Sequence, residues 1–126
     1  MESRKEEIKD ILAAKVKDEN FDIALSGTSA TLVIKVGTKI VVGWVGTTRV
    51  AIHKDDGTFY WLTKANHRPN EISEKVRIYR HRGEIREDPR TGQALIFVRA
   101  RMYPGVAFSR SFGDLLSHKI GVTSEP

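Results

Sequence analysis

Residues 30–45 place the strongest constraint on the fold. They read ATLVIKVGTKIVVGWV, two runs rich in β-branched residues on either side of Gly37-Thr38-Lys39. β-branched side chains favour extended strands, and Gly tolerates the positive φ that a tight turn needs. We therefore expect strands over 30–36 and 40–45, joined as a hairpin.

The strand pattern continues after residue 48. Strands are expected over 49–53 and 59–62, joined by Lys54-Asp55-Asp56-Gly57, whose Asp-Gly pair is a strong hairpin signal. This order predicts an antiparallel meander over 30–62 rather than a βαβ repeat. Two later segments also favour strands, over 93–99 and 106–109.

Helical periodicity appears in three places. Ile8, Ile11, Leu12 and Val16 form an apolar stripe, which predicts an amphipathic helix over 4–18 and an N-terminal unit of residues 1–20. A second helix is expected over 71–82, with Gly83 at its end. A short one is expected over 114–119, because an Asp at the positive end of a helix dipole is favourable. The predicted fold class is α+β.

Composition narrows the setting of the protein. A chain of 126 residues forms one domain at most, and the absence of Cys excludes disulfides and thiolate metal sites. The first 20 residues lack the apolar centre of a secretory signal, and charges interrupt every apolar run before it could cross a bilayer. We expect no membrane contact and a cytoplasmic or otherwise intracellular location.

Basic residues cluster between positions 77 and 90. A partner-binding role is assigned to the arginines of this stretch, Arg77, Arg80, Arg82, Arg86 and Arg90. Acidic residues are interleaved with them, so two interpretations stay open: a solvated charged surface, or a face that binds an acidic partner. Nucleic acid is not the expected partner, because no nucleic-acid-binding motif accompanies the cluster.

Several residues that could have functional roles are interpreted instead as structural or surface residues. Trp44 and Trp61 are expected to pack within or between sheets. The histidines have no metal-ligand spacing and are interpreted as surface or locally hydrogen-bonded residues. Ser26-Gly27-Thr28-Ser29 lacks the Lys and glycine spacing of a phosphate-binding loop and predicts a close-packed strand start.

Four motifs in a fixed order resemble one family. They are SGTSATLVIKVGTKIVVGWVGTTR (26–49), LTKANHRP followed by EKVRI (62–69 and 74–78), and SRSFGD (109–114). They resemble the middle of the metal-dependent PP2C-type Ser/Thr protein phosphatases. The resemblance implies that 21–126 is part of a two-sheet α/β sandwich, incomplete at both ends. It also implies a binuclear Mg²⁺ or Mn²⁺ centre in the complete family, with Asp114 brought near it.

The sequence departs from that family at its acidic positions. Thr47 replaces the Asp of Gly-Asp-Ser-Arg, and Asn66 replaces the Asp of the Leu-Thr-x-Asp-His motif. The family's Asp-Gly-His-Gly motif is absent, and its later Asp motifs would lie beyond Pro126. Adjacent divalent cations need surrounding carboxylates. We therefore expect no bound metal in this chain, with Asp114 a vestigial metal residue or a structural turn and helix cap.

Two functions follow from these departures. The chain is a pseudophosphatase-like interaction or structural module, or it is a segment of an active phosphatase whose metal-binding motifs lie elsewhere. A protein partner or self-association is expected in either case, because a partial sandwich leaves sheet edges and apolar faces uncovered.

Overall fold

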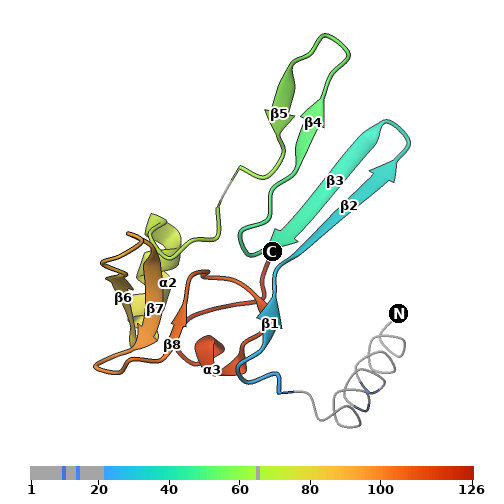
Figure 1. Ribbon diagram of the computed structural model, residues 1–126. Helices are drawn as coiled ribbons and strands as arrows, with labels where there is room; N and C mark the ends of the chain where they lie inside the picture. Colours follow the sequence, from blue (N-terminus) through green and yellow to red (C-terminus); the bar gives the residue numbers. More distant parts are fainter. Residues whose placement is uncertain (1–9, 11–13, 15–21, 65) are drawn as a thin grey trace.

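The computed structural model describes residues 10, 14, 22–64 and 66–126, and the expected helix over 4–18 lies outside this part except at two positions. Figure 1 shows how the strands and helices of this part are arranged. The strands are β1 (Gly27–Thr28), β2 (Ala30–Val36), β3 (Lys39–Val45), β4 (Ala51–His53), β5 (Phe59–Trp61), β6 (Gly83–Glu87), β7 (Ala94–Val98), β8 (Pro104–Val106) and β9 (Phe112–Gly113). The helices are α2 (Ile72–Arg80) and α3 (Leu115–His118).

Two hairpins project from the rest of the molecule (Figure 1). In the first, β2 pairs with β3 from Ala30 opposite Val45 to Val36 opposite Lys39. In the second, β4 pairs with β5. β3 and β4 belong to separate two-stranded sheets, so the antiparallel strands are confirmed but the expected continuous meander over 30–62 is wrong. Gly46 interrupts it, because the chain turns there with a φ of 91°.

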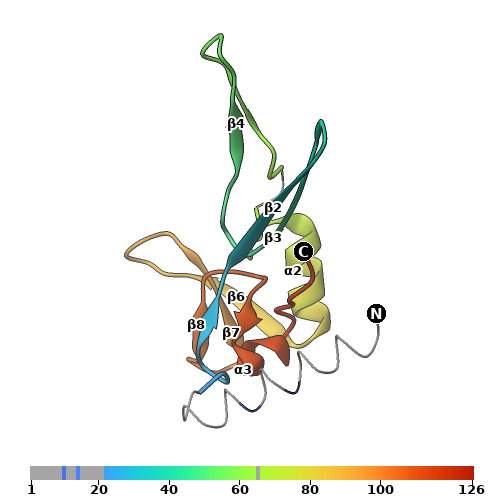
Figure 2. The ribbon, with the colours of Figure 1, turned by 90° about the vertical axis from the view of Figure 1, so that its right-hand side faces the viewer.

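The core lies between α2 and the three-stranded sheet β6-β7-β8. Its buried residues are Ile78, Ile96, Ile120 and Val122, packed against Ile85, Val98 and Val106. Figure 2, turned by 90°, shows α2 beside this sheet with α3 below. The helix supplies Ile78 and the tail after α3 supplies Ile120 and Val122, so the core joins segments that are far apart in sequence.

The predicted elements of residues 66–126 are present with small changes of boundary. The helix expected over 71–82 is α2, and the strand expected over 93–99 is β7. The strand expected over 106–109 is shifted to Pro104–Val106. Sequence analysis missed β6, because Gly83 was interpreted only as a helix end, whereas it also begins the next strand.

None of the helices in the described part of the chain is long and apolar enough to cross a membrane.

Candidate functional site

A buried carboxylate, that of Glu74 on α2, lies at the centre of a hydrogen-bonded cluster. Glu74 is 2% exposed and accepts hydrogen bonds from Arg77 at 2.9 and 2.7 Å. Arg110 donates to the same carboxylate at 2.7 and 3.1 Å, and the Ser109 hydroxyl donates at 2.6 Å. Both carboxylate oxygens are therefore satisfied by charge-assisted bonds, which are about twice as strong as neutral ones.

The electrostatics of this cluster favour the ionised carboxylate. Burial raises the pKa of Glu74, but the hydrogen bonds from Arg77, Arg110 and Ser109 outweigh burial and hold the pKa well below its ordinary value. The same hydrogen bond raises the pKa of Arg110. Glu74 is thus a permanent anion between two permanent cations, and it has no role as a proton donor at neutral pH.

The two arginines also bind backbone carbonyls from other segments. Arg77 Nε donates to the Gly121 carbonyl at 2.8 Å, and its Nη2 donates to the Ser109 carbonyl at 2.7 Å. Arg110 Nη1 donates to the Glu125 carbonyl at 3.1 Å. The cluster therefore fixes α2, the segment before β9 and the C-terminal tail relative to one another. We call Glu74, Arg77, Ser109 and Arg110 the ionic clasp.

His67 lies beside the ionic clasp at the base of the β2–β3 hairpin. Its ring stacks on Trp44 with a centroid distance of 5.6 Å, and its Nδ1 accepts a hydrogen bond from the Gly46 backbone N–H at 3.2 Å. Burial and the nearby Arg110 charge lower the pKa of His67. The histidine is neutral at physiological pH and connects the hairpin to the clasp. His67 is 3% exposed and its Nδ1 bonds to a residue 21 positions away, so its interpretation as a surface or locally hydrogen-bonded residue is wrong.

The motif around Asp114 forms a second close contact. β1 pairs with β9, with Gly27 opposite Gly113, and the Asp114 N–H donates to the Ser26 carbonyl at 2.8 Å. A β-carbon at Gly27 would lie 1.8 Å from Asp114 Oδ2, so only Gly fits there. The predicted close-packed strand start at 26–29 is confirmed. Asp114 occupies the N-cap position of α3 without a side-chain capping hydrogen bond.

The described residues do not fit a binuclear metal centre. No group of three or more His, Asp or Glu side chains within them could hold a metal ion. Asp114 Oδ2 is buried without a hydrogen-bond partner, but it faces the backbone of Gly27 rather than open space. Thr47 and Asn66 supply no charge. A hard divalent cation needs several oxygen ligands, and this donor set cannot provide them.

The structure separates the arginines assigned to partner binding. Arg77 belongs to the ionic clasp, and Arg86 lies on β6 with its guanidinium carbon 4.0 Å from the centre of the Phe97 ring. Arg80, Arg82 and Arg90 are exposed. The described contacts do not test binding, so the partner role stays a prediction, while Arg77 is clearly an internal structural residue.

Trp61 differs from its prediction. Its side chain is 44% exposed, with the Arg49 guanidinium 3.6 Å from the ring centre, rather than packed between sheets. Trp44, in contrast, packs on His67 as expected of an inter-element contact.

Sequence reasoning missed the members of the ionic clasp as a group. Glu74 and Arg77 belong to the EKVRI motif and Ser109 and Arg110 to SRSFGD, so the available signal was the joint presence of two motifs. Their contact joins residues 35 and 36 positions apart, which no local pattern indicates.

The chain thus has an α+β fold in which the EKVRI and SRSFGD motifs contact each other around the buried Glu74. The chain matches the family model for protein phosphatase 2C over residues 2–126 and belongs to that family. The family depends on Mg²⁺ or Mn²⁺ in general.

Individual relatives agree with this assignment. The chain is similar to "Probable protein phosphatase 2C 12" of Oryza sativa subsp. japonica, 29% identical over 85% of this chain and 28% of the relative. It is also similar to "Probable protein phosphatase 2C 73" of Arabidopsis thaliana, 31% identical over 83% of this chain and 29% of the relative.

A solved structure supports the fold. The serine-threonine phosphatase 2C from Toxoplasma gondii superposes with a TM-score of 0.72 at 19% identity, covering 93% of this chain and 40% of that chain. The chain therefore spans less than half of the length of the relatives that it matches.

Proposed function

We propose that this chain is a non-catalytic module of the protein phosphatase 2C family that binds a protein partner. The observation that carries the proposal is the missing carboxylate set: no metal-binding group occurs among the described residues, and neutral side chains occupy positions 47 and 66. Without paired cations, nothing in these residues would activate water for in-line attack on a phosphoryl group.

The retained parts of the fold are structural. The ionic clasp holds three segments together, and the Gly27–Asp114 contact closes the strand pair β1–β9. The exposed apolar side chains of the hairpins, such as Leu32 and Val36, are the kind of surface that a partner covers. This combination supports a binding role rather than a chemical one.

The test is a hydrolysis assay on the purified chain. We expect no turnover of p-nitrophenyl phosphate or of a phosphothreonine peptide with added Mn²⁺ or Mg²⁺, and no Mn²⁺ binding by electron paramagnetic resonance. Asp114→Ala is the matched control. Metal-dependent turnover that this substitution abolishes would refute the proposal.

A second candidate is that the chain is a segment of an active Mg²⁺- or Mn²⁺-dependent Ser/Thr phosphatase. The observation that favours it is coverage, since the chain spans only 28% of one relative and 40% of the Toxoplasma protein. In that case the genomic sequence on either side would encode Asp-Gly-His-Gly upstream and Asp-Gly-x-x-Asp downstream in frame. A longer protein including both would hydrolyse phosphothreonine with Mn²⁺.

A further inference from the structure

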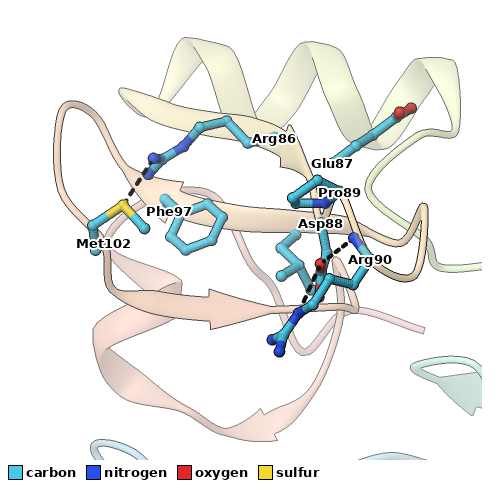
Figure 3. A pocket seen from close by; sticks show the side chains of 8 residues that line it. Arg86, Glu87, Asp88, Pro89, Arg90, Phe97 and Met102 are labelled. Atoms are coloured by element: carbon cyan, nitrogen blue, oxygen red, sulfur yellow. Dashed lines mark hydrogen bonds and ion pairs between the residues drawn. The ribbon is translucent and has the colours of Figure 1, made fainter.

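A groove of about 470 Å³ opens on the three-stranded sheet, away from the ionic clasp. Figure 3 shows it between the turn after β6 and the loop after β7, with Phe97 in its middle. The residues that shape it are Arg86, Pro89, Arg90, Leu95, Phe97 and Met102. Its volume is within the range of pockets that accept a small ligand or one or two side chains.

Strand register explains the apolar base of this groove. Arg86 lies opposite Leu95 in the β6–β7 pairing, and Phe97 follows two residues later, so their side chains share one face of the sheet. Ile96, on the other face, is part of the core. The outer face therefore carries an apolar base that α2 does not cover.

The walls of the groove combine an adaptable apolar side chain with a cation. Met102 is 81% exposed, and its flexible thioether suits contact with another apolar side chain. Arg86 donates to Met102 Sδ at 3.2 Å and to the Arg101 carbonyl. These contacts hold the Arg86 guanidinium over the Phe97 ring, at one end of the groove.

The opposite end carries a cation that is available to a partner. The Arg90 side chain is 90% exposed, and its Nε is 3.9 Å from Asp88 Oδ1, too long for a hydrogen bond. Arg99 and Arg101, near Met102 in the chain, are also exposed. Arginine forks bind carboxylates in two-point contacts, so this rim matches a segment with negative charges.

Two acidic residues, Glu87 and Asp88, also line the groove. Asp88 Oδ1 accepts a hydrogen bond from the Arg90 backbone N–H at 2.8 Å, which fixes the turn. Figure 3 shows the Glu87 side chain pointing away from Phe97. Glu84 Oε1 lies 3.5 Å from Arg86 Nε and offsets the Arg86 charge, so the most exposed positive charge on the rim is that of Arg90.

Nucleic acid fits this surface less well than a peptide. Base stacking needs an accessible aromatic face, but Phe97 is 9% exposed and Arg86 covers its ring. An apolar side chain of a peptide can instead contact the exposed Met102, which requires no open aromatic face.

We propose that this groove binds an acidic peptide segment of a protein partner, with one apolar side chain of the peptide seated against Met102 and a flanking carboxylate on Arg90. The inference rests on the proposed partner-binding function and names its site and the chemistry of the partner. Of the arginines predicted from the sequence, the proposal retains Arg90 as the residue that binds a carboxylate, keeps Arg86 as a residue that lines the groove, and leaves out Arg77.

The probe for this proposal is a labelled synthetic peptide, Glu-Asp-Glu-Leu-Phe-Glu-Asp-Glu, titrated with the full chain and followed by fluorescence anisotropy. One control peptide replaces every acidic residue by its amide, and another replaces Leu-Phe by Gly-Gly. We expect the parent peptide to bind at least about tenfold more tightly than the amide peptide at low salt, and the difference to shrink as salt rises.

Three variants locate the binding surface. Arg90→Glu should weaken binding of the parent peptide by about fivefold or more, because it reverses an exposed rim charge. Lys39→Glu makes the same charge change on the distant β2–β3 hairpin and should have less than about a twofold effect. Met102→Gln should weaken the parent peptide and leave the Gly-Gly peptide unchanged. All three positions are exposed, so folding is not at risk.

Several results would overturn the groove proposal. They are equal binding of the acidic and amide peptides, equal effects of Arg90→Glu and Lys39→Glu, and tighter binding of a single-stranded RNA than of the parent peptide. The hydrolysis assay is an independent test. Turnover in it would refute the proposed non-catalytic function, whereas a chain that shows neither turnover nor peptide binding would refute only the groove proposal.

Discussion

Residues 66–126 bury an apolar core together with a saturated ionic clasp, whereas the hairpins β2–β3 and β4–β5 leave most of their apolar side chains in solvent. Leu32 and Val36 are 62% and 63% exposed, although both lie in well-paired strands. The first region is stabilised by packing and by charge pairing. The second is held mainly by backbone hydrogen bonds.

This difference shows that strand pairing and burial are separate requirements. A two-stranded hairpin alone is marginal in water, and a ribbon with apolar residues on both faces gains full stability only when something covers it. The hairpins are thus the part of the described chain with the least internal packing, and the clasp region is the part with the most.

The largest expected effect is a loss of stability when the ionic clasp is disrupted. Glu74→Gln should lower the free energy of unfolding by about 3–5 kcal/mol, because it leaves two partly buried guanidinium groups without their anion. Glu71→Gln, on an exposed residue of the same segment, should change it by less than about 0.5 kcal/mol. Urea denaturation followed by near-ultraviolet circular dichroism measures both. Equal stabilities would show that the clasp contributes little.

The next largest expected loss of stability comes from crowding the close contact between Gly27 of β1 and Asp114. Gly27→Ala should cost about 1–3 kcal/mol, because the new methyl group would overlap the Asp114 carboxylate and the Phe112 carbonyl. At Gly43 an added β-carbon meets nothing within 4 Å, so Gly43→Ala is the control and should be nearly neutral. Thermal unfolding of the two variants makes the comparison. A neutral Gly27→Ala would mean that β1 moves away from β9 easily.

The hairpins should respond in association rather than in stability. We expect the purified chain to self-associate, and the double substitution Leu32→Thr with Ile34→Thr to reduce the associated fraction while the clasp region unfolds as before. Both side chains are exposed and lie on the same face of β2. Sedimentation velocity is the measurement. A wild-type chain that is monomeric at high concentration would contradict this expectation.

The smallest expected effect is on the pH dependence of stability, and it comes from His67, which lies between the β2–β3 hairpin and the clasp region. Because the pKa of His67 is lowered in the folded state, its contribution to stability is present above its ordinary pKa of 6.5 and is lost as pH falls through the lowered value. Wild type should therefore lose some stability between about pH 7 and pH 5, while His67→Asn should show a flatter profile over that range. Denaturation midpoints at several pH values give the slopes, and parallel slopes would exclude His67 as their source.

Local patterns predicted β2 to β5, β7 and α2, since β-branched runs, an Asp-Gly turn and helical periodicity are local signals, but they missed β6 and misplaced β8. The separation of the two hairpins was not predictable in this way, because it depends on the backbone turn at Gly46. The exposure of Trp61 was missed for a related reason, since a strand pattern does not say whether a second layer covers it. The clasp depends on contacts between distant segments, so its residues were visible only as members of two motifs.

The clasp also has a consequence for the order in which the protein forms. The turn of the β2–β3 hairpin joins Val36 to Lys39, whereas Arg77 must find the Gly121 carbonyl 44 residues away. Closing long loops is entropically costly, so local contacts form first. During synthesis the hairpins leave the ribosome before residues 109–121 exist. The nascent chain therefore exposes its apolar hairpins before the residues that complete the ionic clasp have been synthesised.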